Sequence, residues 1–149
     1  MRRNIVFLLF VFTLIFLFSC SKKEDKVGRE LEDKMSKLLG QIVVELKEPK
    51  VIDNLDPRKF VELSAIMLVS NYYWTKELIS SNSNVSPEEI DSYKTLKKQQ
   101  LLSSFGLTLD DYENYSIKNY KELQEFSKEN PEVMDLYNEI ARSLPTFED

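Results

Sequence analysis

The side chains that most enzymes use for catalysis are scarce in this chain, which contains a single cysteine, Cys20, and no histidine. Without histidine, neither a Ser-His-Asp nor a Cys-His arrangement can form, and every histidine-containing metal site is excluded. The sequence also has no calcium loop with Asp-x-Asp-x-Asp-Gly spacing, no Gly-x-Gly-x-x-Gly motif and no P-loop. We therefore expect no catalytic residue, no metal site and no cofactor.

Acid–base chemistry remains open through paired carboxylates, which glycosidase-type hydrolases place on either side of the bond that they cleave. The visible groups are Asp53 with Asp56, Glu88 with Glu89, and Asp110 with Asp111. Each group lies at or just before an expected helix start, where the helix dipole stabilises negative charge. Helix capping is therefore the main interpretation, and a carboxylate-based hydrolase is an alternative.

Three consecutive aromatic residues, Tyr72, Tyr73 and Trp74, form the other distinctive group. Successive residues of a helix are rotated by about 100°, so these side chains cannot all face the core. One of them is expected near a surface or groove, and Tyr112 and Tyr115 of a later helix would line the opposite wall. The pattern predicts either core packing with one half-buried tyrosine or an aromatic groove for a small molecule, peptide, glycan or lipid.

The elements that position these side chains are expected to be helices, because a chain with 3 glycines and 5 prolines lacks the turn residues that β-hairpins require. Apolar residues recur at spacings of three and four, as on one face of a helix. Cap residues and prolines divide the chain into five expected helices, over residues 26–47, 57–79, 87–105, 109–129 and 131–144. We predict one all-α domain over residues 27–149, a small bundle of about five helices with the aromatic groove between the second and fourth.

Local signals mark several helix boundaries. Ser86 with Glu89, and Thr108 with Asp111, have the spacing of capping boxes at helix starts. Gly106 is predicted to end the third helix in a left-handed conformation.

The first residues have the features of an export signal. Arg2 and Arg3 form a short positive leader, and a stretch of 14 residues from Ile5 to Phe18 is apolar except for one threonine. As a helix, this stretch is about 21 Å long, which is too short for a hydrocarbon core of about 30 Å and typical of a signal peptide.

The four residues Leu17-Phe18-Ser19-Cys20 resemble the lipobox of bacterial lipoprotein precursors, which has an aliphatic residue at minus three, a small residue at minus one and an invariant cysteine. The resemblance implies cleavage between Ser19 and Cys20, a diacylglyceryl thioether on Cys20 and acylation of the new amino group. An ordinary export signal with a cysteine near the cleavage point is the alternative.

The same resemblance implies a location and an anchor. Residues 1–19 are then the signal peptide, and residues 20–26 are the lipidated cysteine and a charged tether. Two or three acyl chains on one residue give lasting attachment, because each buried methylene contributes about 0.8 kcal/mol and one chain alone is marginal. We expect a lipid-anchored protein of the cell envelope, at the outer rather than the inner membrane of a two-membraned cell, since Ser21 resembles a residue that permits outward transfer.

The charge of the mature chain limits its partners. Loss of the signal lowers the number of basic residues from 20 to 18 against 25 acidic ones, which gives a net charge of −7. Nucleic-acid binding depends on the neutralisation of phosphates by Lys and Arg, so nucleic acid is not an expected partner. The expected partners are the membrane, through the lipid, and an envelope protein.

The mature part resembles a family of small helical lipoproteins from envelope-bearing bacteria in two segments, GLTLDDY at 106–112 and NPE at 130–132. That family has no established activity, so the resemblance implies a fold and no mechanism. We therefore expect a non-catalytic binding, scaffold or accessory role, with a ligand binder that uses the aromatic groove as the alternative and a hydrolase as the third hypothesis.

Overall fold

The computed structural model describes residues 26–48, 50–82 and 84–147, and the expected signal peptide and Cys20 lie outside this part of the chain. Within it the chain forms six helices and no strand, which confirms the all-α prediction. The helices are α2 (Lys26–Ile42), α3 (Pro57–Ser81), α4 (Pro87–Ser104), α5 (Leu109–Lys118), α6 (Tyr120–Glu129) and α7 (Pro131–Ser143). No described helix combines the length and hydropathy that a membrane crossing needs.

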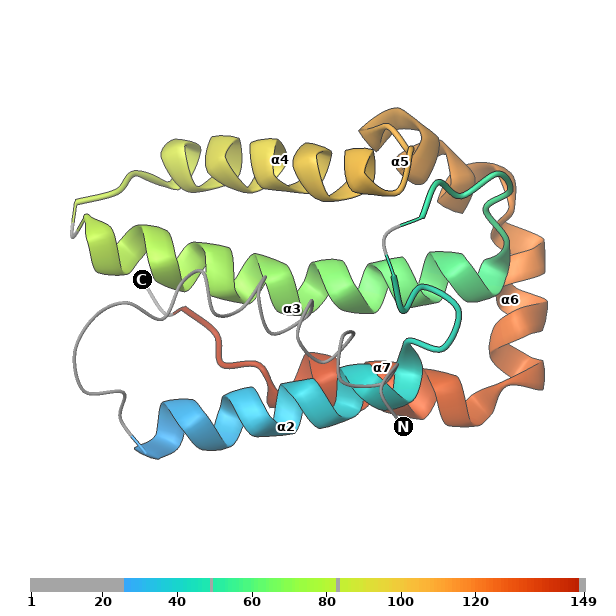
Figure 1. The fold of residues 1–149 in the computed structure, drawn as a ribbon, viewed down its shortest axis with the longest axis horizontal. Coiled ribbons are helices and arrows are strands. Elements are labelled where there is room, and N and C mark those ends of the chain that lie inside the picture. The colour runs from blue at the N-terminus through green and yellow to red at the C-terminus, as the bar shows by residue number, and fades with distance from the viewer. Residues whose placement is uncertain (1–25, 49, 83, 148–149) are drawn as a thin grey trace.

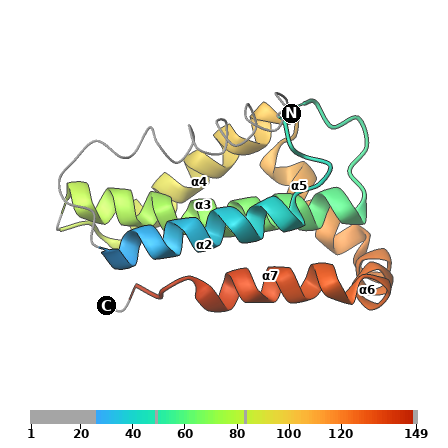
Figure 2. The same cartoon turned by 60° about the horizontal axis from the view of Figure 1, so that its bottom comes forward.

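Helix α3, with 25 residues, is the longest of the described helices and runs through the middle of the bundle (Figure 1). Helix α4 lies along one side of α3 and α2 along another, and α7 runs beside α2 (Figures 1 and 2). The short helices α5 and α6 close one end and carry the chain from the α4 side to the α7 side (Figure 1). The four long helices thus form the body of the bundle, and the two short ones form one end of it.

The hydrophobic core lies between α3 and the other three long helices. Its largest fully buried apolar side chains are Met35 and Ile42 of α2, Leu63 of α3, Leu102 of α4 and Ile140 of α7. Complete burial of an apolar side chain of this size contributes about 1.5–3 kcal/mol. All four long helices therefore share one core.

Helix α2 ends at Ile42, which is about one turn before its predicted end. The fully buried carboxylate of Glu62 on α3 accepts hydrogen bonds from the backbone N–H groups of Glu45 at 3.0 Å and Leu46 at 2.9 Å. Arg58 donates to the same carboxylate at 2.8 Å and to the Ile42 carbonyl at 2.7 Å. These long-range bonds replace those of a further helical turn, and the apolar spacing of the sequence could not reveal them.

The helix predicted over residues 109–129 is in fact two helices, α5 and α6, which corrects the expected count of about five to six within the described chain. The break is at Asn119, whose φ of −108° and ψ of 25° lie outside the helical range. Its backbone N–H donates to the Tyr115 carbonyl at 2.9 Å, and its side-chain amide donates to the same oxygen at 3.1 Å. Asparagine side chains compete in this way with helical hydrogen bonds, and here the competition ends α5.

Side-chain caps begin three of the helices, as the sequence predicts. The Asp56 carboxylate caps α3, and Ser86 and Glu89 form a reciprocal box at α4 with distances of 3.2 and 2.8 Å. A second box joins Thr108 and Asp111 at α5. Each cap satisfies backbone N–H groups that have no partner within the helix.

Gly106 ends α4 with a φ of +73°, as predicted. Its N–H donates to the Ser103 carbonyl at 3.0 Å, and the N–H of Leu107 donates to the Leu102 carbonyl at 3.0 Å. This pair of bonds is the Schellman motif, in which glycine adopts the left-handed conformation without strain.

Candidate functional site

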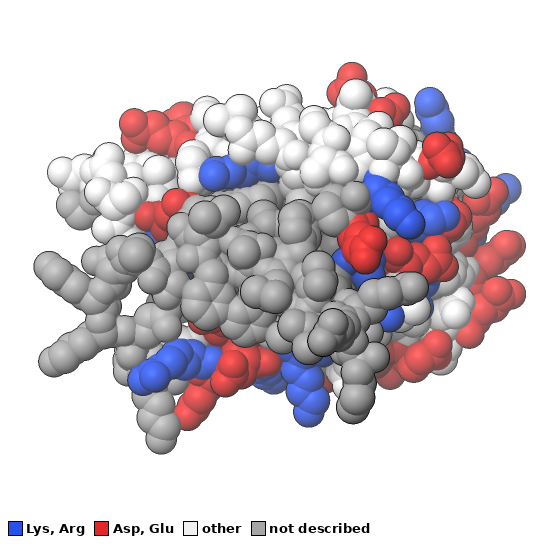
Figure 3. All heavy atoms as spheres, viewed as in Figure 1, with Lys and Arg blue, Asp and Glu red and all other residues white. Residues whose placement is uncertain are grey.

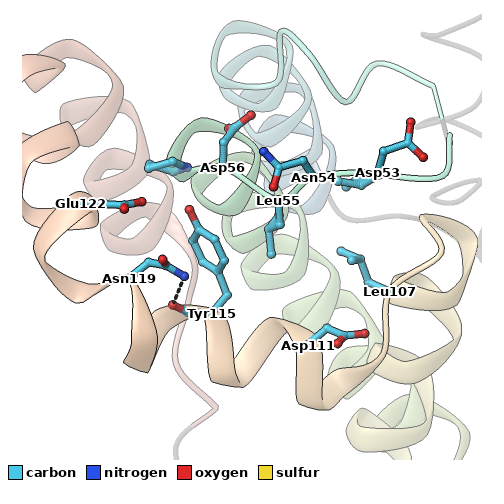
Figure 4. Close-up of a pocket in the computed structure, with 11 residues that line it drawn as sticks. Asp53, Asn54, Leu55, Asp56, Leu107, Asp111, Tyr115, Asn119 and Glu122 are labelled. Atoms are coloured by element: carbon cyan, nitrogen blue, oxygen red, sulfur yellow. Dashed lines mark hydrogen bonds between the residues drawn. The ribbon is translucent and has the colours of Figure 1, made fainter.

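A pocket of about 460 Å³ lies at the end of the bundle where α3 begins (Figure 4). It is open to solvent and mostly polar, and it separates the entry segment of α3 (residues 52–57) from α5 and α6. The lining residues are Ile52, Asp53, Asn54, Leu55, Asp56, Pro57, Leu107, Asp111, Tyr115, Asn119 and Glu122.

The entry segment is held at both of its ends. The backbone N–H of Ile52 donates to the Phe105 carbonyl, at the end of α4, at 2.8 Å. At the other end, the backbone N–H of Lys59 donates to Asp56 at 2.9 Å, and its ammonium group bonds to the Asp56 carboxylate and, at 3.2 Å, to the Asn54 carbonyl. One wall of the pocket is therefore fixed by bonds to α3 and α4.

The opposite wall, helix α5, is fixed by aromatic stacking on Phe60 of α3. The Tyr112 and Tyr115 rings stack on the Phe60 ring with centroid distances of 4.7 and 5.2 Å. The Tyr112 hydroxyl also shares a hydrogen bond of 2.6 Å with the Ser64 hydroxyl. With α5 held in this way, Tyr115 points from the helix into the pocket, toward the entry segment (Figure 4).

Four carboxylates line the pocket, those of Asp53, Asp56, Asp111 and Glu122. Burial raises the pKa of Asp56, but the hydrogen bonds and the positive charge of Lys59 outweigh it, so the pKa is lowered overall. Hydrogen bonds from the Thr108 hydroxyl and N–H lower the pKa of Asp111. Both groups are ionised at neutral pH, so neither is the protonated acid that glycoside hydrolysis requires.

Tyr115 is expected to ionise only near pH 12, because burial and the negative charges of Glu122 and Asp56 raise its pKa to about 12. The unfolded chain loses this proton first, near the ordinary pKa of 10.0. The stability that depends on this group is therefore complete below pH 10.0 and is lost as the pH rises toward 12.

Glu122→Gln tests this electrostatic origin. Removal of one negative charge should lower the pKa of Tyr115, followed by tyrosinate absorbance and assigned by comparison with Tyr115→Phe. Glu113→Gln, at an exposed position of α5, is the matched control and should leave the titration unchanged. An equal shift in the two variants would contradict the assignment.

The three consecutive aromatic residues lie elsewhere and are packed. Trp74 is only 4% exposed, and Tyr73 is half-buried against the core. The Tyr72 ring stacks on Phe147 with a centroid distance of 5.2 Å and contacts the Tyr73 ring edge-on at 5.2 Å. These contacts agree with the interpretation that the three residues pack against the core. Two tyrosines, Tyr72 and Tyr73, are half-buried, whereas the sequence predicted one.

The structure does not bring this group together with Tyr112 and Tyr115. Those two tyrosines contact α3 at Phe60, and Tyr112 also contacts Ser64, twelve and eight residues before Tyr72. Eight to twelve residues of helix span about 12–18 Å. The two sets of aromatic residues therefore do not line a common groove, and only Tyr115 is part of the pocket.

Sequence reasoning did not identify Asn54, Asn119 and Glu122 as pocket residues. The local sequence does carry a signal for Asn119, because asparagine in a helical pattern favours a break. No comparable signal exists for Glu122, which has the appearance of an ordinary solvent-facing helix residue. Of the other predicted carboxylates, Glu88 and Asp110 are exposed at helix starts, where the capping interpretation places them.

The arrangement of the pocket is suited to binding a polar or cationic group, through the Tyr115 hydroxyl and carboxylates on several sides (Figure 4). Among the described residues, no group of three or more His, Cys, Asp or Glu side chains is placed to hold a metal ion. No known protein family, curated protein or solved structure matches this chain.

Proposed function

We propose that the chain is the precursor of a lipid-anchored cell-envelope lipoprotein whose helical domain has a non-catalytic binding, scaffold or accessory role. The observation that carries the proposal is the segment Leu17-Phe18-Ser19-Cys20 directly after an apolar stretch of signal-peptide length. Cys20 is the single cysteine of the sequence. An unpaired thiol in an exported chain needs an explanation, and lipidation at this position provides one.

Two features of the pocket support binding to a protein partner over catalysis. The carboxylates of Asp56 and Asp111 are engaged as helix caps and ionised, so they serve structure. Sites for small molecules are mostly apolar and enclose their ligand, whereas this pocket is polar and open. An open polar surface is typical of the rim of a protein interface.

Replacement of Cys20 by Ala in the full precursor should abolish attachment through lipid. The wild-type protein should enter the detergent phase on Triton X-114 partition, and the variant should stay in the aqueous phase or keep its leader. Ser19→Ala keeps a small residue at minus one and is the matched control, which should be processed as the wild type. Mass spectrometry that finds a free thiol on Cys20 of the wild-type protein would refute the anchor.

Proximity labelling from the anchored protein in its native cell tests the binding role. We expect enrichment of an envelope protein that is lost with Cys20→Ala, and separation of the membranes of a two-membraned cell should place the protein in the outer one. If the wild-type protein and Cys20→Ala label the same proteins, the proposal that the domain binds a partner at the membrane would be contradicted.

A small-molecule ligand of the pocket is the second candidate, because the volume of about 460 Å³ falls within the range of about 300–1,000 Å³ for ligand sites. Nuclear magnetic resonance with a library of small amines would show shifts at Tyr115 and Asn119, and these should vanish in Tyr115→Ala. Shifts spread evenly over the acidic surface would argue against a ligand site.

A further inference from the structure

We propose that one end of the bundle, formed by the start of α2, the last turns of α3 and Phe147, lies on the phospholipid surface, with the pocket at the opposite end facing the aqueous compartment. The proposal rests on the lipid anchor of the proposed function. It adds an orientation and a contact surface, which the anchor alone does not determine.

The tether limits how far the domain can stand from the membrane. Helix α2 begins at Lys26, six residues after Cys20. A fully extended chain spans at most about 3.3–3.6 Å per residue, so the start of α2 lies within about 22 Å of the lipidated residue. This reach is shorter than α3, whose 25 residues extend over about 37 Å.

The antiparallel packing of α2 and α3 decides which end of the bundle this short tether holds. A Cβ at Gly28 would lie 3.8 Å from the Lys76 ammonium nitrogen, so the first turn of α2 is beside the last turns of α3. At the other end, Ile42 of α2 bonds to Arg58 at the start of α3. The pocket includes Pro57, so it lies a whole length of α3 away from the tether.

The tether end carries an apolar patch, which we define as Val27, Tyr72, Lys76, Ile79 and Phe147. Three of these residues lie on one stripe of α3, because positions 72, 76 and 79 are four and three apart. Phe147 joins the stripe, because its ring stacks on Tyr72. Val27 is exposed directly before Gly28, whose Cβ would lie beside Lys76, and so extends the patch onto the first turn of α2.

The patch has the composition of a surface that contacts lipid headgroups. Val27 is 68% exposed, Ile79 is 39% exposed and Phe147 is 43% exposed, and Lys76 is exposed among them. Apolar and aromatic side chains beside a lysine insert at the boundary of headgroups and acyl chains, with the ammonium group near the phosphates.

The start of α2 exposes charges of both signs, Arg29 and Lys34 with Glu30 and Asp33, whereas the opposite end is acidic. Acidic side chains line the end of the molecule at α6 (Figure 3), and four carboxylates line the pocket there. An anionic membrane surface repels such a cluster. Glu88 and Glu89 are exposed at the start of α4, so the contact is confined to the side of the tether end formed by α2, α3 and Phe147.

Single introduced cysteines can test this orientation, because the acylated Cys20 leaves no other thiol for a label. The lipidated protein carries a fluorophore in Ile79→Cys, within the patch, or in Ile117→Cys, which is 75% exposed on α5 at the pocket end. Each form is bound to phosphatidylcholine–phosphatidylglycerol vesicles that contain lipids with a nitroxide near the headgroup. The label at position 79 should be quenched several-fold more than the label at position 117.

A further variant separates the patch from the anchor. Val27→Asp with Phe147→Asp should reduce the quenching at position 79, while the protein still floats with the vesicles. Equal quenching at positions 79 and 117 on floated protein would overturn the orientation and leave the anchor intact. Failure of the wild-type protein to float would overturn the anchor and the orientation together.

Discussion

Glu62→Ala is expected to lower the free energy of unfolding by about 3 kcal/mol, at the lower end of the cost of breaking a buried ion pair, because the Arg58 side chain is 22% exposed. The Glu62 carboxylate is fully buried and accepts hydrogen bonds from Arg58 and from the backbone N–H groups of Glu45 and Leu46. The substitution leaves the buried Leu46 donor and the part-buried Glu45 donor without this acceptor, while Arg58 keeps its bond to the Ile42 carbonyl. Domains of this size have a total stability of about 5–15 kcal/mol, so the variant should be close to its folding limit.

Urea denaturation of the domain without its leader measures this loss. Glu113→Ala, at an exposed position of α5, is the matched control and should change the stability by no more than about 0.5 kcal/mol. Glu62→Gln keeps an acceptor oxygen and should fall between the two. Hydrogen exchange adds a local readout, because the Glu45 and Leu46 amides should exchange faster in both Glu62 variants. A loss below about 1 kcal/mol for Glu62→Ala would show that the ion pair does not clamp α2 to α3.

Gly106→Ala is expected to destabilise the domain by about 1.5–3.5 kcal/mol, from two separate causes. A residue with a Cβ at the φ of +73° costs about 1–2 kcal/mol. That Cβ would also lie 2.9 Å from Cγ1 of Val51, just before the entry segment. Val51 is exposed, so its side chain can shift, and a displacement from its preferred rotamer costs about 0.5–1.5 kcal/mol.

The combination with Val51→Ala separates the two causes. Val51 is 71% exposed, so its truncation alone should have a small effect. In the double variant the crowding is relieved and the backbone cost remains, so denaturation should show recovery of part of the loss. Gly106→Asn should be milder than Gly106→Ala, because asparagine tolerates the left-handed conformation. If the double variant loses the sum of the stabilities lost by the two single variants, the Val51 side chain does not contact the Cβ introduced at position 106.

The link between this turn and the pocket gives the same variants a second readout. Leu107, directly after Gly106, lines the pocket, and Phe105, directly before it, binds the backbone of Ile52. A distorted turn should therefore move the entry segment and change the environment of Tyr115. The sequence shows the glycine, but its role in shaping the pocket is visible only in the fold.

Sequence reasoning was most accurate where neighbouring residues decide the structure. The boxes of Ser86 with Glu89 and Thr108 with Asp111, and the left-handed Gly106, were all predicted and are all present. In each case the relevant hydrogen bonds join atoms within five positions along the chain. Composition and apolar spacing likewise sufficed for the all-α class.

Predictions that depended on distant residues were less accurate. The early end of α2 depends on Glu62, sixteen residues after Leu46, and the Arg58–Glu62 spacing of four gave no sign that the carboxylate would reach another helix. The aromatic groove failed for a related reason. Periodicity shows which face a residue occupies, but it does not show which turn of α3 the tyrosines of α5 will contact.

By itself, the sequence determined the helical class, the caps and the C-terminal end of α4, because these follow from backbone geometry and bonds between near neighbours. It also supplies the cysteine and the segment before it on which the proposed anchor depends. Tertiary structure alone decided that Asp56, Asp111 and Glu122 meet around Tyr115, and that Gly28 lies beside Lys76. These pairings arise when helices pack antiparallel on one core. Burial of apolar surface is non-directional, so a local sequence pattern does not specify which residues of two helices will lie side by side.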